Sequence, residues 1–198
     1  SEMCIRDSHF NPAVFALADR KADIQFLLGN DFHLTPHNLT KWQLSPEIAA
    51  KCRRCGKHGT FTPLPGVTVE TFPSTDEGVA WMVTVNGQSI FHAGDLNWWH
   101  WAEEDLAWNR NMEANFKRYT EPLRGRRVDL AMLPLDSRLK MDGYLGPNYF
   151  LNLMEVRRFL PMHQWEDFAF TDEFLSAYPQ FAPITVKIHR DGEFLGEL

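Results

Sequence analysis

The chain has 198 residues, of which 44% are hydrophobic and 23% are charged, which is ordinary for a soluble globular protein. Its formal net charge of −6 disfavours a general nucleic-acid-binding or anionic-membrane surface. No apolar run approaches the roughly 18 residues of a membrane-spanning helix, and an odd count of three cysteines gives no disulfide framework. We therefore expect a cytoplasmic protein with neither a nucleic-acid nor a membrane partner.

Helical and strand-like patterns alternate along the chain, which is typical of an α/β fold. Asn86-Gly87 separates two apolar segments and predicts a tight hairpin. In chain order, helices are expected at residues 12–20, 46–51, 102–118, 149–156 and 172–178. Strands are expected at residues 24–28, 67–72, 79–85, 89–92, 128–133, 159–162 and 184–189.

Polar side chains with possible chemical roles follow three of these strands. Asp95 comes after Gly94, whose backbone freedom lets a carboxylate turn into a cleft. His163 follows Pro161-Met162 at the end of another strand, and Asp76 lies in the loop 73–78. Each motif alone also has an ordinary structural explanation, because Gly-Asp is a common turn and Ser, Thr and Asp side chains cap loops.

Taken together, these segments resemble the metallo-β-lactamase superfamily of metal-dependent hydrolases, in its broad branch rather than the true β-lactamases. The resemblance extends over residues 9–190, and Leu133-Pro134-Leu135-Asp136 after a buried strand is part of it. It implies an α/β architecture, the αββα four-layer sandwich of the metallo-β-lactamase type, missing its first strands. It also implies that Asp95 bridges two metal ions and that His163 binds the second.

The main signature of that family, His-x-His-x-Asp-His, is incomplete in this chain. His9 fits its last histidine, and no residues match the earlier positions. Residues 1–8 resemble a translated sequencing-adapter sequence, so we expect a non-native leader followed by one N-terminally truncated domain at 9–198. Asp76 stands in a loop where many members carry a metal-binding histidine, and it serves either as an oxygen ligand or as a turn cap.

The metal centre that the resemblance implies holds two zinc ions, with manganese or iron as alternatives. Zinc accepts imidazole nitrogen and carboxylate oxygen ligands, and the implied ligands here are His9, Asp76, Asp95 and His163. The implied reaction is attack by a metal-bound hydroxide on an ester, amide, lactone or phosphoester of a small-molecule substrate, with Asp95 and His163 as catalytic residues. Further candidates for contacting the substrate or supporting the metal ligands are His100, Asp136 and Arg138.

Few ligands remain for the first metal ion, so we expect this chain to bind metal weakly and to be impaired as an enzyme. The alternative, from a different class, is a non-catalytic member of the same fold that binds a ligand or a partner. The sequence leaves the substrate, the native metal and the oligomeric state open.

A second motif of metal-binding type is Cys52-Arg53-Arg54-Cys55. A structural zinc ion needs two further ligands beyond a Cys-x2-Cys pair, and the histidines nearest in sequence are His33, His37 and His58. The motif is therefore either a zinc-ribbon-like binding module or two reduced thiols in a basic loop.

Trp98, Trp99 and Trp101 follow the proposed bridging carboxylate. Aromatic side chains there either wall a substrate pocket or pack against the helix expected at residues 102–118. Two of the three are expected in the core.

Overall fold

A computed structural model describes residues 11–190 and 192–196 of the chain. Its contacts divide into two compact units, Ser1–Gly56 and Lys57–Leu198, and each unit is described by itself. Among the described residues, no helix combines the length and the apolar character that crossing a membrane requires.

The first unit is a small assembly of short elements around a two-stranded parallel sheet. Phe15, at the centre of the first helix, packs edge-on against Phe26 of the first strand. The side chains of Asn11, Thr35 and Ser45 each accept a backbone N–H at a helix start, with a proline next in the chain. The elements are η1 (Pro12–Asp19, a 3-10 helix), β1 (Phe26–Gly29), α1 (Pro36–Lys41), α2 (Pro46–Ala50) and β2 (Cys52–Cys55).

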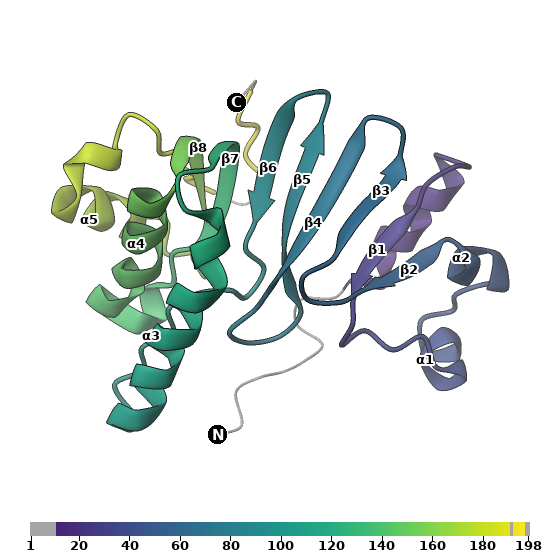
Figure 1. Cartoon of the computed structure of the whole chain (residues 1–198), viewed down its shortest axis with the longest axis horizontal. Helices are drawn as coiled ribbons and strands as arrows, with labels where there is room; N and C mark the ends of the chain where they lie inside the picture. Colours follow the sequence, from purple (N-terminus) through teal and green to yellow (C-terminus); the bar gives the residue numbers. More distant parts are fainter. Residues whose placement is uncertain (1–10, 191, 197–198) are drawn as a thin grey trace. The chain divides into compact units, whose positions relative to one another are not determined.

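The second unit is built on a six-stranded mixed sheet (Figure 1). Its strands lie in sequence order and are β3 (Thr60–Leu64), β4 (Val67–Pro73), β5 (Val79–Val85), β6 (Gln88–His92), β7 (Arg127–Pro134) and β8 (Glu155–Met162). The expected hairpin between β5 and β6 is confirmed, because Asn86 (φ 51°) and Gly87 (φ 81°) both have the left-handed backbone of a type I′ turn.

Strand direction decides where the functional loops lie. Neighbouring strands are antiparallel from β3 to β6, whereas β6, β7 and β8 are parallel. The carboxyl ends of β4, β6, β7 and β8 therefore share one edge of the sheet. In open α/β sheets, that edge is where ligands usually bind.

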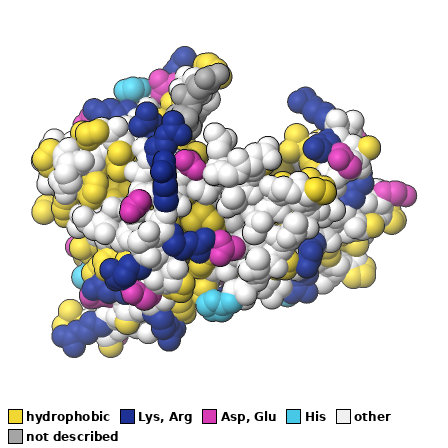
Figure 2. All heavy atoms as spheres, turned by 45° about the horizontal axis from the view of Figure 1, so that its top comes forward, with side chains coloured by type: hydrophobic (Ala, Val, Ile, Leu, Met, Phe, Trp, Pro, Cys, Tyr) yellow, Lys and Arg dark blue, Asp and Glu magenta, His cyan; other side chains and the backbone are white. Residues whose placement is uncertain are grey.

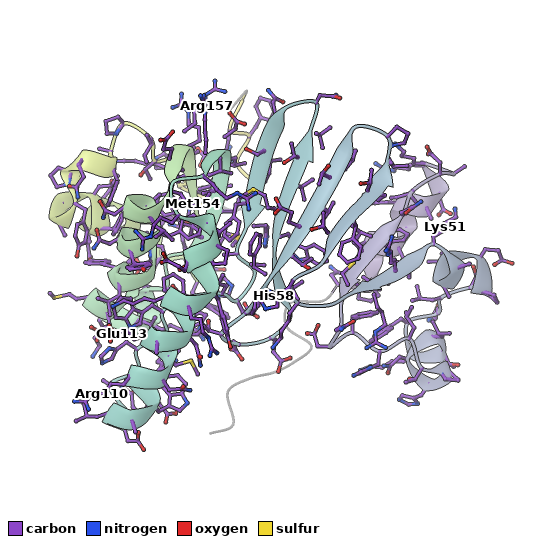
Figure 3. The ribbon with its side chains drawn as sticks, viewed as in Figure 1. Lys51, His58, Arg110, Glu113, Met154 and Arg157 are labelled. Carbon is purple, nitrogen blue, oxygen red and sulfur yellow. The ribbon has the colours of Figure 1, made fainter. Side chains whose placement is uncertain are left out.

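Helices gather beside the β7–β8 end of the sheet in Figure 1. They are α3 (Leu106–Thr120), η2 (Glu121–Leu123), η3 (Ser137–Tyr144), α4 (Leu145–Leu153), α5 (Phe170–Ala177) and η4 (Pro179–Phe181). Asp105 caps α3 by accepting the Trp108 N–H. Figure 3 labels Arg110 and Glu113 on α3, Met154 between α4 and β8, and Arg157 on β8.

The core of the second unit lies between the sheet and these helices. Phe91, Ala131 and Phe159 stand side by side on β6, β7 and β8, and all three are fully buried. Phe150 of α4 packs on Phe91, and Phe174 of α5 packs edge-on against Phe159. Burying each of these phenylalanines contributes about 1.5–3 kcal/mol, so this layer holds the strand ends in place.

Two expected elements differ from the structure. The helix expected at 149–156 lies at Leu145–Leu153, and residues 155 and 156 already belong to β8. The strand expected at 184–189 is absent from that described segment, which pairs with β8 only at the bridge between Thr185 and Phe159. Short apolar runs do not distinguish helix from strand, so such boundaries depend on packing that the sequence does not display.

Some charged side chains of the second unit form ion pairs at close range. On the face drawn in Figure 2, acidic side chains lie among the Lys and Arg side chains. Arg126 makes a two-point ion pair with Glu70, and Arg124 makes one with Glu121. The arginines before β7, which the sequence presents as a charge run, are thus partly committed to local pairs.

Candidate functional site

Two of the three loops singled out in the sequence are hydrogen-bonded to each other at the carboxyl edge of the sheet. Thr75, after β4, donates its hydroxyl to the carbonyl oxygen of Asn97 (2.7 Å) and also contacts that of Asp95 (3.3 Å). The same hydroxyl oxygen accepts the Asn97 N–H (3.0 Å). The loop that carries Asp76 is therefore tied to the loop that carries Asp95.

Gly94 makes the turn that presents Asp95. Its φ is +56°, which disfavours any side chain, and an added Cβ would lie only 3.1 Å from the carbonyl oxygen of Val79. Both facts favour glycine at this position. The Trp99 indole N–H donates to the Asp95 carbonyl oxygen (3.0 Å), which holds the following segment against the loop. The Asp95 side chain is only 12% exposed.

His163 leaves the end of β8 in a left-handed conformation (φ 60°), which costs a non-glycine residue free energy and is common at functional sites. Its Nε2 lies 3.3 Å from Oδ1 of Asp95. Its Nδ1 lies 3.9 Å from Oδ2 of Asp136. The fold thus places the imidazole between carboxylates that follow β6 and β7.

Asp136 is fully buried and heavily hydrogen-bonded. Arg138 donates Nε–H and Nη2–H to the two carboxylate oxygens, with a shortest distance of 2.6 Å, and its backbone N–H also donates to Oδ1. The Trp165 indole N–H donates to Oδ2 (3.2 Å). A buried carboxylate needs such partners to offset its lost hydration.

Aromatic rings and one guanidinium surround these groups in a closed series of contacts, which we name the Trp–Arg rim. Trp99 contacts His163 (6.0 Å between ring centres), and His163 contacts Trp165 (6.4 Å). The Arg138 guanidinium lies 4.3 Å from the Trp165 ring centre and 5.4 Å from that of Trp101. Trp101 stacks on Trp99 and closes the series (6.3 Å).

A pocket of about 290 Å³ is lined in part by His163 and Trp165. It lies between the loop after β8 and the segment 188–195, and its wall includes apolar groups of Met162, Phe168 and Ile188 together with charged groups of Glu166 and Arg190. Its size and mixed lining suit a small molecule.

His92, the last residue of β6, was not singled out from the sequence. Its Nδ1 accepts the Gly94 N–H (3.0 Å) and so supports the turn before Asp95. Although the residue keeps part of its surface exposed, desolvation of the ring lowers the pKa of His92, and the nearby His163 adds to this effect while Asp95 opposes it. The ring is accordingly neutral at pH 7, as its acceptor role requires.

The other predicted site residues are placed less tightly. Asp76 is exposed, and its backbone N–H donates to Ser74 Oγ (3.2 Å). In this hydrogen bond the capping side chain is that of Ser74. His100 is half-buried. His9 lies outside the described residues. Two of the three tryptophans after Asp95 belong to the core, as expected, because Trp99 is buried and Trp98 packs against the core cluster. Trp101 is half-buried and stacks on Trp99.

The Cys52–Cys55 motif does not form a metal cluster within the described part of the chain. Cys52 Sγ donates to the Ile48 carbonyl (3.3 Å) and Cys55 Sγ to the Arg53 carbonyl (3.7 Å). Burial raises the pKa of both thiols. Across the described residues, no group of three or more His, Cys, Asp or Glu side chains could hold a metal ion, and this applies to the Cys52–Cys55 pair as it does to the predicted ligands Asp76, Asp95 and His163.

Comparisons with known proteins give no sequence match and a clear structural one. No protein-family model and no curated protein match the sequence. CmlA, a diiron β-hydroxylase from Streptomyces venezuelae, superimposes with a TM-score of 0.53 at 8% identity, covering 83% of this chain and 38% of CmlA. A CmlA variant gives a TM-score of 0.52, covering 81% of this chain and 37% of its own.

A protein from Thermotoga maritima, described as a zinc-dependent hydrolase of the metallo-β-lactamase superfamily, matches at 17% identity with a TM-score of 0.36, covering 57% of this chain and 49% of that protein. The chain therefore spans less than half the length of each of these three structures. In its mixed sheet and adjoining helices, the chain shares the fold of the part of CmlA on which it superimposes, and the expected α/β class is confirmed.

Proposed function

We propose that the chain is the core of a metal-dependent hydrolase in which Asp95 and His163 hold the metal. The observation that carries this proposal is the 3.3 Å distance between Asp95 Oδ1 and His163 Nε2. These atoms come from distant segments, and each is presented by a residue or turn with a left-handed backbone. Backbone strain of this kind persists where the surrounding structure enforces it.

The spacing of the two atoms suits a shared metal ion. A tetrahedral zinc ion, with bonds of about 2.0–2.2 Å, keeps its ligand atoms roughly 3.3–3.6 Å apart. The observed distance lies at the lower end of that range and beyond the usual length of a nitrogen–oxygen hydrogen bond. Carboxylate oxygen and imidazole nitrogen also suit manganese and iron, so the donor types do not select among these metals.

The described residues supply two ligands, which fits part of a zinc site and not a whole one. We assign His9 and Asp76 as further ligands of a two-ion centre, with Asp95 between the ions. A set this sparse gives weak metal binding and impaired turnover in this chain.

A metal ion held there would acidify a bound water and polarise the scissile carbonyl or phosphoryl group. Asp95 and His163 orient the reacting centre. Asp136 faces His163 Nδ1 and favours the tautomer that leaves Nε2 free to bind, as carboxylates do behind metal-binding histidines. Trp99 and Trp165 flank the imidazole and limit access of bulk water.

The substrate is a small molecule with an ester, amide, lactone or phosphoester bond. The 290 Å³ pocket beside His163 has room for the part of the molecule that does not react. A nucleic-acid partner is not part of the proposal, since the chain is acidic overall.

The test is zinc content by elemental analysis after equilibration with zinc, for the wild type, Asp95→Ala and His163→Ala. Asp172→Ala and His189→Ala are matched controls, because both residues form exposed ion pairs elsewhere in the second unit. We expect the wild type and controls to hold zinc at less than full occupancy and both site variants to lose most of it. Site variants that stay folded by circular dichroism and keep wild-type zinc would contradict the proposal.

Zinc occupancy also distinguishes the hydrolase from the second candidate function, a non-catalytic member of the same fold that binds a ligand or partner. The incomplete ligand set among the described residues favours this candidate. A wild type that is folded and free of zinc, with no metal-dependent turnover of ester or phosphodiester substrates, would support it. Full occupancy in the wild type would contradict the weak binding proposed above.

A further inference from the structure

Arg138 uses only one side of its guanidinium. Its Nε–H and Nη2–H donate to Asp136, which occupies one of the two forks that a guanidinium presents. A guanidinium carries five N–H donors. Among the described residues, Nη1 makes no hydrogen bond, and the second Nη2–H points along the same free side. Two parallel N–H groups therefore remain, and their geometry lets them donate to both oxygens of a carboxylate.

The position of this free fork is fixed before any ligand arrives. Asp136, which anchors Arg138, has no exposed surface. Trp165 and Trp101 lie 4.3 Å and 5.4 Å from the guanidinium. Aromatic contacts of this kind stabilise a guanidinium and restrict it. Little side-chain entropy is then lost on binding, which favours affinity.

The fork is also reachable. The Arg138 side chain is 37% exposed and Trp165 is 54% exposed. One carboxylate separates Arg138 from the reacting centre, because Asp136 Oδ2 contacts both Arg138 Nη2 (2.6 Å) and, at 3.9 Å, His163 Nδ1. Asp136 therefore links Arg138 to His163, so a group bound by Arg138 lies near the reacting centre proposed at His163.

We propose that Arg138 and Trp165 form an oxyanion subsite that selects substrates with a non-reacting carboxylate close to the scissile bond. That the bound molecule is a substrate rests on the proposed function. Binding of a carboxylate to the subsite itself requires neither metal nor turnover. Arg138 supplies two parallel N–H donors, and Trp165 supplies an exposed aromatic edge for the adjoining carbon skeleton. An uncharged ligand of the same shape loses the ionic hydrogen bonds and binds more weakly.

The experiment is a titration of ¹⁵N-labelled protein in EDTA, observed through the Trp165 indole N–H resonance. The probes are benzoate and benzamide, which have the same shape and differ in charge. We expect benzoate to shift this resonance with a Kd at least tenfold lower than that of benzamide. Equal affinities for the two probes would overturn the proposal, and tighter binding of phenyl phosphate than of benzoate would overturn the carboxylate assignment.

Variants of Arg138 test whether the preference for benzoate arises at this side chain. Arg138→Gln removes the fork and is expected to abolish the preference for benzoate, and Arg138→Lys, which keeps the charge without the fork, is expected to lose most of it. Arg126→Gln is the matched control, because Arg126 makes an equivalent two-point pair with Glu70 elsewhere on the sheet. If the Gln variant does not fold, the Lys variant decides, and unchanged benzoate affinity in it would contradict the fork.

Failure of this proposal and failure of the proposed function are distinguishable. The titration contains no metal and measures no turnover, so benzoate binding at Arg138 is independent of zinc at Asp95 and His163. A chain that binds zinc and hydrolyses an ester without preferring benzoate refutes the subsite alone. A chain that prefers benzoate and never binds zinc refutes the hydrolase alone.

Discussion

Two residue pairs in this chain have the chemistry of metal ligands, and the fold treats them in opposite ways. Cys52 and Cys55 are close in sequence and lie on one strand of the first unit. Asp95 and His163 are far apart in sequence and approach within 3.3 Å in the second unit. Among the described residues no third ligand joins either pair, so the pairs differ in how the fold brings their two side chains together.

The difference follows from backbone geometry. Side chains on a strand alternate between its two faces, so residues three positions apart, such as Cys52 and Cys55, point to opposite sides. A Cys-x2-Cys pair binds one metal ion only where the backbone turns between the two residues. By contrast, β6 and β8 run parallel with β7 between them, so the residues that follow them converge at one edge.

The largest expected effect is that zinc stabilises the second unit through His163 and not through the cysteines. At 100 times its Kd, a ligand that binds only the folded state adds about 2.7 kcal/mol to the free energy of unfolding. We expect this gain in the wild type and in Cys52→Ser/Cys55→Ser, and its loss in His163→Ala. Tryptophan fluorescence during thermal unfolding measures it, since six of the seven tryptophans lie in the second unit.

Loss of the zinc-dependent gain in the double cysteine variant would reverse the comparison, because the thiols would then be the metal ligands. The result would also require a rearrangement of β2, since the two thiols now donate to separate carbonyl groups.

How far the sequence predicts this site depends on the level of structure. The hairpin at Asn86-Gly87 and the strands beside it follow from turn chemistry and apolar alternation. The approach of Asp95 to His163 was predicted through a family resemblance, and strand-end logic supports it. The hairpin prediction rests on the local backbone, which short sequence patterns describe well, whereas the approach of Asp95 to His163 joins segments that are far apart in sequence.

The Trp–Arg rim could not be predicted in the same way. Arg138 was a candidate, but its two-point contact with Asp136 and its place between Trp101 and Trp165 depend on side-chain conformations. The one available signal was Trp165 two residues after His163. Similarly, the start of β8 at Glu155 was missed because the apolar run before it suits either a helix or a strand.

The second-largest effect sharpens the role assigned to Asp136. Removing a carboxylate behind a metal-binding histidine typically weakens metal affinity by about 10–100-fold. We expect Asp136→Asn to weaken zinc binding by that factor. Asp129→Asn is the matched control, because Asp129 lies on β7, the strand that leads to Asp136, and accepts hydrogen bonds from Ser89. Competition with a colorimetric zinc chelator measures both affinities, and equal losses would show a general effect of altering β7.

A smaller effect tests the strain at the end of β8. His163, Trp165 and Glu166 have positive φ angles, whereas no residue from Cys52 to Cys55 has one. A left-handed backbone costs a non-glycine residue about 1–2 kcal/mol, so Glu166→Gly (φ 64°) is expected to raise the free energy of unfolding by about 1 kcal/mol. Glu173→Gly, in α5, is expected to lower it by about 1 kcal/mol. Urea unfolding followed by circular dichroism measures both, and a destabilised Glu166→Gly would argue against strain at this turn.

The smallest effect is a few-fold difference in thiol reactivity. Because burial raises the pKa of Cys52 and Cys55, less of each thiol is ionised at pH 8 than in an unfolded chain, where the pKa is about 8.5. In a Cys4→Ser background, labelling of the folded protein by a disulfide reagent is expected to be slower than labelling in urea, with the rate still rising above pH 8.5.

The unfolded chain loses its thiol protons first, so the two cysteines stabilise the fold below pH 8.5 and lose that contribution as the pH rises further. Zinc is expected to leave the rate unchanged, since a thiol with a raised pKa is a poor metal ligand at neutral pH; protection by zinc would instead assign the metal to the cysteines.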